Sequence, residues 1–365
     1  MDKLYTALGL MSGTSLDGID ASILTSDGEN IIKIERNIYE SYESNLKKDL
    51  NNYINNIQEF DDIKNSKAEY IDLEKKITIK HIEISKKIIS DYKKNVDIVG
   101  FHGQTILHRP EEKCSIQMGD ANLLSSLLKV RVIHNFRKKD IENNGNGAPL
   151  SPIYHLKLSN EIGLKKPCIF LNIGGISNLT YIEENKIKAK DIGPGNVLID
   201  EYMKIKKKGN YDKDGQCASQ GRIDHNLVNQ FIEHEIYNTK KKHSLNRGDF
   251  DISFVRALTF ENAIATLTYF TAKLITNRII QNYNKNIDIV VCGGGRKNNT
   301  LIKHIENNLE KKIFKIDEFG IDGDFIESQA FGYLAIRSLL KKNITFPDTT
   351  KVLIPCTGGE VVKNY

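Results

Sequence analysis

Apolar residues recur along this chain with two different periods. Short apolar runs bounded by turn residues indicate buried strands, whereas apolar positions three or four residues apart indicate helices. The clearest helical pattern covers 66–94. Its apolar stripe consists of Tyr70, Leu73, Ile77, His81, Ile84 and Ile88. Because His81 lies on this stripe, we interpret it as a packed, hydrogen-bonded histidine with no catalytic role.

The same patterns predict strands that alternate with helices along the whole chain. The predicted strands are 4–10, 19–25, 31–39, 97–101, 130–133, 168–173, 178–182, 186–190, 287–292 and 313–316. The predicted helices are 43–58, 66–94, 121–129, 196–206, 224–235, 254–282, 299–309 and 325–340. Each half opens with a strand, a glycine turn and further strands, followed by helices. This coarse duplication predicts an α/β protein built from two lobes.

The densest turn signal is Gly145-Asn146-Gly147-Ala148-Pro149, and it gives the predicted lobe boundary. The N-terminal lobe is expected at 1–147 and the C-terminal lobe at 148–365. An alternative for the C-terminal tail is that it packs back on the first lobe. A chain of 365 residues is long enough for two such cores.

Charge and cysteine content restrict the class of protein further. The net charge of +5 comes from 52 basic and 47 acidic residues spread along the chain, so no nucleic-acid partner is indicated. The apolar run Leu4–Met11 is too short for a signal peptide or a membrane span. Five widely spaced cysteines, with no CxxC pair, fit neither a zinc site nor a disulfide framework. We expect a cytoplasmic protein with no membrane partner; the oligomeric state stays open, a homodimer included.

Three glycine turns directly follow predicted strands, at 9–20, 172–178 and 293–295. Glycine lets the backbone approach an anion closely, and the N–H groups of a turn form a concave anion site. Any one of these turns alone is equally compatible with a tight hairpin. The chain has no GxxxxGK[ST] loop, and no GxGxxG follows the first strand, which excludes P-loop and Rossmann phosphate sites. The candidate nucleotide-binding residues are Gly13, Thr14, Ser15, Leu16, Asp17, Gly18, Ile19, Asp20, Gly174, Gly175, Gly293, Gly294 and Gly295.

Two duplicated lobes, each with a strand-turn-strand hairpin, resemble the RNase H-like fold of actin, Hsp70 chaperones and hexokinases. That fold binds its nucleotide in a cleft between the lobes. Six further motifs resemble, in order and approximate spacing, those of the anhydro-N-acetylmuramic acid kinases. They are Gly9–Gly18, His102–Thr105, Gly147–Leu150, Asn172–Gly175, Asp191–Asn196 and Cys292–Gly295. The resemblance runs from residue 9 to about residue 331, nearly the whole chain.

Two positions depart from the family pattern. Asn135 stands before Phe136-Arg137 where the family has an acidic residue, and Asn146 stands between two glycines where the family has glutamine. Both positions are near the expected sugar site, so the fine substrate contacts stay open.

The resemblance implies an ATP- and Mg²⁺-dependent kinase that opens the 1,6-anhydro bridge of the sugar and phosphorylates O6. It implies Asp191 as the base that activates water, although an aspartate near a helix start is also a reasonable cap. Glu327 is expected to contact the sugar or Mg²⁺. His102, Gln104 and Arg137 are expected sugar contacts, Arg137 through the lactyl carboxylate.

Two alternative functions remain at this point. One is a levoglucosan-type kinase, which has the same mechanism but acts on an unsubstituted anhydrosugar. The other is an actin- or chaperone-like ATPase, which the short tail after the second lobe disfavours. Asp17 and Asp20 are ambiguous, since one could order metal-bound water while the other only holds the turn.

Overall fold

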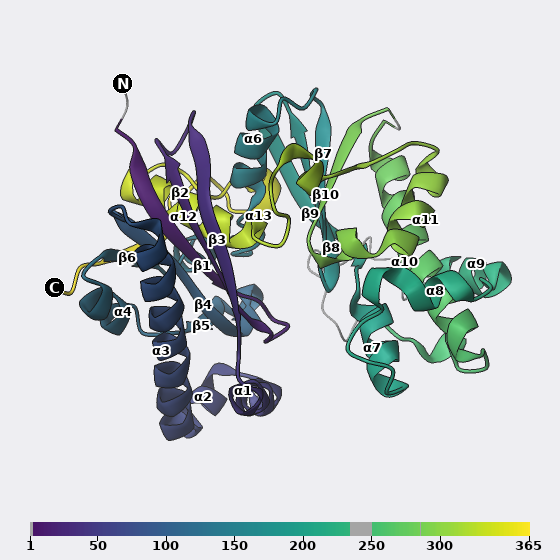
Figure 1. Cartoon of the computed structure of the whole chain (residues 1–365), viewed down its shortest axis with the longest axis horizontal. Helices are drawn as coiled ribbons and strands as arrows, with labels where there is room; N and C mark the ends of the chain where they lie inside the picture. Colours follow the sequence, from purple (N-terminus) through teal and green to yellow (C-terminus); the bar gives the residue numbers. More distant parts are fainter. Residues whose placement is uncertain (1–2, 234–249, 285) are drawn as a thin grey trace. The chain divides into compact units, whose positions relative to one another are not determined.

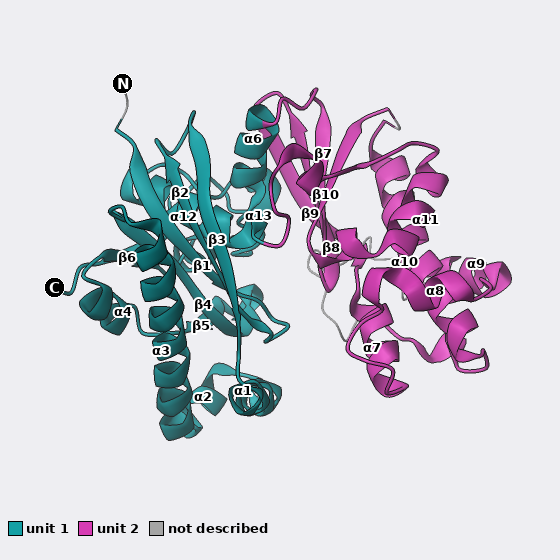
Figure 2. Ribbon diagram, in the orientation of Figure 1, with its two compact units in different colours: residues 1–161, 325–365 teal, residues 162–324 magenta. Residues whose placement is uncertain are grey.

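The computed structural model describes residues 3–233, 250–284 and 286–365 (Figure 1). The chain forms two compact units (Figure 2). Unit 1 contains residues 1–161 and 325–365, and unit 2 contains residues 162–324. No helix among the described residues is long and apolar enough to cross a membrane.

Unit 1 is built on a mixed sheet of seven strands. These are β1 (Tyr5–Ser12), β2 (Gly18–Ser26), β3 (Ile32–Ser41), β4 (Ile98–Arg109), β5 (Cys114–Met118), β6 (Arg131–His134) and β12 (Glu360–Val362). The strand order is β12-β6-β4-β1-β2-β3, and β5 pairs with β4. Strands β1, β2 and β3 are antiparallel neighbours, whereas β4 is parallel to both β1 and β6.

Unit 2 repeats this arrangement with five strands. They are β7 (Cys168–Ile173), β8 (Ile176–Glu183), β9 (Lys186–Pro194), β10 (Asp288–Cys292) and β11 (Phe314–Lys315). The order is β11-β10-β7-β8-β9, with an antiparallel β7-β8-β9 meander and parallel β7-β10-β11 pairs. Both sheets therefore share one strand order and one pattern of directions, which confirms the predicted duplicated α/β fold of the actin, Hsp70 and hexokinase type.

Among the described residues, eight helices lie close to their predicted positions, and the five others had no predicted counterpart. In unit 1 they are α1 (Ser44–Asn56), α2 (Phe60–Asn65), α3 (Lys67–Tyr92), α4 (Ala121–Leu128), α5 (Lys138–Glu142), α6 (Pro152–Glu161), α12 (Ile326–Leu339) and α13 (Pro347–Thr350). In unit 2 they are α7 (Val197–Ile205), α8 (Gln216–Gln220), α9 (His225–Glu233), α10 (Phe260–Asn282) and α11 (Asn299–Leu309).

The predicted helix at 254–282 is wrong at its start. A short 3-10 turn occupies Ser253–Val255, and α10 begins only after Thr259, whose side chain caps it by accepting from the backbone N–H of Asn262. The last two residues of the predicted helix 224–235 lie outside the described residues.

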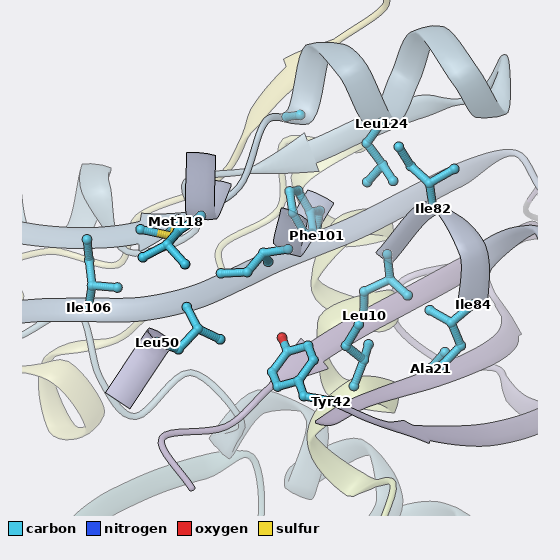
Figure 3. Close-up of a cluster of buried hydrophobic side chains, with 14 of the residues drawn as sticks. Leu10, Ala21, Tyr42, Leu50, Ile82, Ile84, Phe101, Ile106, Met118 and Leu124 are labelled. Carbon is cyan, nitrogen blue, oxygen red and sulfur yellow. The ribbon is translucent and has the colours of Figure 1, made fainter. Parts of the chain in front are cut away.

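The main core of unit 1 lies between the sheet and the helices that follow β3 (Figure 3). Leu8 and Leu10 of β1 point into it together with Ile77 and Ile84 of α3. His81 lies on the same face of α3, fully buried, with Nδ1 2.9 Å from the carbonyl oxygen of Ile77. Burial lowers the pKa of His81 to about 4. The interpretation of His81 as a packed histidine is therefore confirmed.

The opposite face of the same sheet is covered by α12, which packs on β1, β2 and β4. Gly9 and Gly100 are paired across β1 and β4, and both lie under this helix. A Cβ at Gly9 would overlap the carbonyl oxygen of Ser328, and one at Gly100 would overlap that of Phe331. Glycine at these two positions lets the helix backbone touch the sheet backbone.

The two units differ from the predicted division of the chain at both ends. Residues 148–161 belong to unit 1, because α6 packs against α12 and β3. Residues 325–365 also belong to unit 1, because α12 covers its central strands and β12 pairs with β6. Local patterns cannot reveal which sheet a distant helix will cover.

We predict that Gly100→Ala lowers the free energy of unfolding by about 1–3 kcal/mol, because the new methyl group must displace the backbone of α12. Chemical denaturation measures this difference. Gly13→Ala is the matched control, since the nearest atom to its Cβ would be 3.8 Å away. Equal stability of the two variants would contradict the close contact between α12 and the sheet.

Candidate functional site

The turn between β1 and β2 carries the first group of candidate nucleotide residues. Thr14 and Ser15 are exposed at its tip. The turn is fixed to β4, because Ser12 Oγ donates to the carbonyl oxygen of Gly103 at 3.0 Å and Gln104 Nε2 donates to that of Gly13 at 3.1 Å. The structure thus brings two motifs that are about 90 residues apart into contact.

The strand that contains His102 and Gln104 is longer than predicted. We expected it to end at Phe101, but β4 continues to Arg109 and pairs with β5. Gly103 has φ +74°, and the pairing of β1 with β4 shifts register between Leu10 and Ser12. This irregularity lets the chain pass the turn without leaving the sheet.

The other candidates of this turn have mainly structural contacts. Asp17 forms an ion pair with Lys47, and its carbonyl oxygen accepts from Tyr39 Oη at 2.9 Å. Leu16 is buried and has φ +57°, and a Cβ at Gly18 would overlap the carbonyl oxygen of Glu40. Ile19 is also buried, and Asp20 lies beside it on β2, partly buried. These contacts fit a role for Asp17 in holding the turn.

His102, which is buried, and Arg137, which is partly buried, form the centre of a polar group in unit 1. Arg137 Nη2 lies 2.8 Å from His102 Nε2, and His102 Nδ1 lies 2.7 Å from the carbonyl oxygen of Gly103. Since arginine can only donate, His102 Nε2 accepts and Nδ1 carries the proton. Burial and the positive charge of Arg137 hold the pKa of His102 well below its ordinary value. His102 is therefore neutral and its tautomer is fixed.

Arg137 retains an unused donor. Its Nη1 donates to the carbonyl oxygen of Gly147 at 2.7 Å, whereas its buried Nε has no hydrogen-bond partner. Burial lowers the pKa of Arg137 to about 10, although the charges of Glu327 and Asp140 oppose this shift. No carboxylate among the described residues lies within ion-pair distance of the Arg137 guanidinium.

Glu327 lies in the first turn of α12 and belongs to the same unit as Arg137. Its side chain is accessible to solvent. Desolvation by the surrounding protein nevertheless raises the pKa of its carboxyl group, and the positive charge of Arg137 opposes this. The ring of Phe331, one helical turn further along α12, lies 4.5 Å from the His102 ring. Helix α12 thus places Glu327 in the electrostatic field of Arg137.

Asp140 and Thr350, which fix the loop beside Arg137, had no signal in the sequence. Asp140 is buried; one oxygen accepts from the Gly147 N–H at 2.6 Å and the other from Thr350 Oγ1 at 2.6 Å. The Asn146 N–H donates to the carbonyl oxygen of Thr350 at 2.6 Å. Thr350 comes from the C-terminal segment, so no local pattern links it to this loop.

The departure at Asn135 has a structural explanation. The amide of Asn135 donates to Glu360 at 2.7 Å, and Lys138 forms an ion pair with the same carboxylate at 2.6 Å. An acidic residue at position 135 could not donate to Glu360 and would repel it.

In unit 2 the glycine turns at 174–175, 193–195 and 293–295 converge. Gly174-Gly175 is the turn between β7 and β8, and its two carbonyl oxygens accept from the N–H groups of Asn196 and Gly195, each at 2.8 Å. A Cβ at Gly293 would overlap the side chain of Asn172 at the end of β7. The second and third predicted turns therefore meet at one edge of this sheet.

Asp191 lies within β9 rather than after it. We expected the strand to end at 190, but it continues to Pro194, and Asp191 pairs with Asn178 of β8. The pairing shifts register between Ser177 and Asn178, and Gly193 has φ +153°. Asp191 is partly buried and lies four residues before Gly195. The strand, not the turn, therefore sets its direction.

No group of three or more His, Cys, Asp or Glu side chains within 3–233, 250–284 and 286–365 is arranged to hold a metal ion. Glu327 is a single carboxylate. Mg²⁺ is commonly held by one or two carboxylates together with phosphates and water, so Glu327 fits an ion that arrives with a nucleotide and does not fit a resident ion.

Comparison with known proteins adds the family. The family model described as anhydro-N-acetylmuramic acid kinase matches residues 5–363. The chain belongs to this family. It is therefore an enzyme, a kinase.

Related anhydro-N-acetylmuramic acid kinases align over the full chain. The one from Pelagibacter ubique (strain HTCC1062) is 47% identical over 375 residues, with all of both chains covered. Those from Brucella canis and Agrobacterium fabrum are 36% and 35% identical over 372 residues, also with full coverage. Component A of the (R)-2-hydroxyglutaryl-CoA dehydratase of Acidaminococcus fermentans covers 92% of the chain and 100% of its own at 11% identity. The TM-score of this superposition is 0.47.

We predict that Gly294→Val folds normally but weakens nucleotide binding. Among the described residues, the nearest atom to a Cβ at Gly294 is the side-chain nitrogen of Asn196, 3.9 Å away, so the added side chain has room at the turn. Gly174→Val tests the first turn of unit 2 in the same way, since its Cβ would lie 3.4 Å from the nearest atom. Calorimetric titration with an ATP analogue measures the affinity. Unchanged affinity in both folded variants would mean that these turns are ordinary hairpins.

Proposed function

We propose that this kinase uses ATP to open the 1,6-anhydro ring of 1,6-anhydro-N-acetylmuramic acid and to phosphorylate O6. The products are N-acetylmuramic acid 6-phosphate and ADP, which places the enzyme in cell-wall sugar recycling. The family match over residues 5–363 carries this proposal. A cytoplasmic location fits the five free cysteines at 114, 168, 217, 292 and 356.

The anhydrosugar has no free O6 hydroxyl, so water must replace O6 at C1, and a base is needed to take a proton from that water. Asp191 takes a proton from water, and the water oxygen forms a bond to C1 as the C1–O6 bond breaks. O6 then forms a bond to the γ-phosphorus while the bond from that phosphorus to the ADP oxygen breaks. The proton on Asp191 returns to solvent, so the step is balanced.

Each unit contributes glycine turns as proposed nucleotide contacts. In unit 1 the exposed hydroxyls of Thr14 and Ser15 and the backbone after Gly13 offer donors to phosphate. In unit 2 the turns at Gly174-Gly175 and Gly293–Gly295 offer close backbone approach. Mg²⁺ supplies neutralisation of the phosphate charge when it is bound with the nucleotide, and Glu327 is the carboxylate that would hold it or the sugar.

Arg137 supports an acidic sugar over an unsubstituted one. Its guanidinium is charged and has an unused Nε donor, with no carboxylate within ion-pair distance among the described residues. The lactyl carboxylate of the muramic acid would compensate this charge. Levoglucosan has no carboxylate, so it would leave the guanidinium uncompensated. In an actin- or chaperone-like ATPase, which binds no acidic sugar, the unpaired charge of the Arg137 guanidinium would have no ligand to bind.

We predict that ATP turnover depends on the anhydrosugar and that Asp191→Asn lowers kcat about 10²–10⁴-fold, as expected for the loss of a general base. ADP release is measured with 1,6-anhydro-N-acetylmuramic acid, with levoglucosan and without sugar. Asp288→Asn, at a partly buried aspartate that begins β10, is the matched control and should retain activity.

Three outcomes would contradict these assignments. Sugar-independent ATP hydrolysis would favour the ATPase alternative, and equal turnover of levoglucosan would favour the levoglucosan-type kinase. Normal kcat in a folded Asp191→Asn variant would remove Asp191 as the base.

We predict that in H₂¹⁸O the product carries the label at the anomeric carbon and none in the phosphate ester, because water replaces O6 at C1. With a single base and room for one water, the first-formed product should have inverted configuration at C1. Mass spectrometry locates the label, and early-time NMR gives the anomer before mutarotation. Label in the phosphoryl group, or a retained configuration, would refute the one-base mechanism.

A further inference from the structure

Arg296 is a buried charge at the end of the third glycine turn. Its side chain is only 2% exposed to solvent. Five hydrogen bonds leave its guanidinium: Nε to Asp317 Oδ2 at 2.7 Å, Nη2 to Asp317 Oδ1 at 2.9 Å, Nη1 to Asp324 Oδ1 at 2.6 Å, Nη2 to Asp322 Oδ1 at 3.3 Å, and Nη1 to the carbonyl oxygen of Gly293 at 3.1 Å. The group is therefore fully engaged with one loop and one turn.

The loop at 317–324 both binds this guanidinium and leaves space for it. Asp317 binds it through both carboxylate oxygens, the arrangement that only arginine can make. A Cβ at Gly323 would overlap Arg296 Nε, so glycine there leaves room for the side chain. Burial opposes the charge, but the hydrogen bonds to Asp317 and Asp324 outweigh it and raise the pKa of Arg296. The charge is thus retained and compensated.

The other end of this network is the turn itself. Gly293 has φ +76°, and Cβ atoms at Gly293 and Gly295 would overlap Asn172 and Ile173 of β7. The turn therefore has little freedom on the side of the sheet, while Gly294 faces open space. The bond from Arg296 to the Gly293 carbonyl oxygen fixes the first peptide of the turn, and the acidic loop fixes Arg296.

We infer that Arg296 is a positioning residue for nucleotide binding: it holds the Gly293–Gly295 turn in its binding form through the acidic loop at 317–324 and does not itself touch the nucleotide. The inference rests on the proposed nucleotide role of this turn. It predicts that loss of the fork with Asp317 changes affinity for the nucleotide and leaves affinity for the sugar unchanged.

The test compares Arg296→Lys with the wild-type enzyme. A lysine retains the charge but cannot bind Asp317 through two parallel bonds, so we expect Kd and KM for ATP to rise about tenfold, while KM for the sugar changes less than twofold. Calorimetry without sugar gives the nucleotide Kd. Asp322→Asn, at the longest of the carboxylate contacts, should have a smaller effect than Asp317→Asn.

Arg337→Lys is the matched control. Arg337 is also buried and donates to two carbonyl oxygens, those of Gly28 and Asn343, but it belongs to unit 1. It should lower stability without changing the nucleotide Kd. An equal rise of Kd in this control, or wild-type Kd in Arg296→Lys, overturns the inference. If Arg296→Lys does not fold, wild-type Kd in folded Asp317→Asn overturns it.

Failure of the proposed function gives a different result. A wild-type protein that binds ATP but does not turn over the anhydrosugar contradicts the proposed reaction, and the comparison of nucleotide Kd values still decides the role of Arg296. A wild-type protein that does not bind ATP overturns both.

Discussion

The contact between α12 and the central strands of unit 1 is the constraint on which the candidate site of that unit depends. Two glycines that face each other across β1 and β4 let the helix backbone rest directly on the sheet. Larger residues at these positions would hold α12 away from the sheet. The same helix carries Glu327 and Phe331, and Phe331 packs on His102. The contact of the α12 backbone with the sheet therefore positions Glu327, whose negative charge acts on Arg137.

The polar group of unit 1 is supported by a second set of contacts from the C-terminal segment. Thr350 and Asp140 fix the loop that contains Gly147, and the carbonyl oxygen of Gly147 fixes Arg137. Arg137 in turn fixes the tautomer of His102. Each of these groups forms a hydrogen bond to the next, so most donors of the network have an acceptor. The Nε of Arg137 has none and is available to a ligand.

The two units share a strand order but use it differently. Unit 1 places the partly buried Arg137 shortly after β6, whereas unit 2 gathers glycine turns at the ends of β7, β9 and β10. Arginine stabilises both arrangements, through neutral partners at Arg137 and through three carboxylates at Arg296. A partly buried guanidinium with neutral partners retains an attraction for an anion, whereas a fully compensated one acts as a fixed support.

The sequence by itself determined most of the elements and the family. The periodicity of apolar residues predicted α3, α11 and most strands closely, because these signals are local and each element buries one face. The glycine motifs indicated candidate turns for close approach of the backbone to a ligand, and this role stays a prediction. Only the tertiary structure decided that α6 and α12 belong to unit 1, that Asp191 lies within a strand, and that Asp140, Thr350 and Arg296 support the turns. Those facts depend on pairs of residues far apart in the chain, and no local pattern records which distant partner will satisfy a buried group.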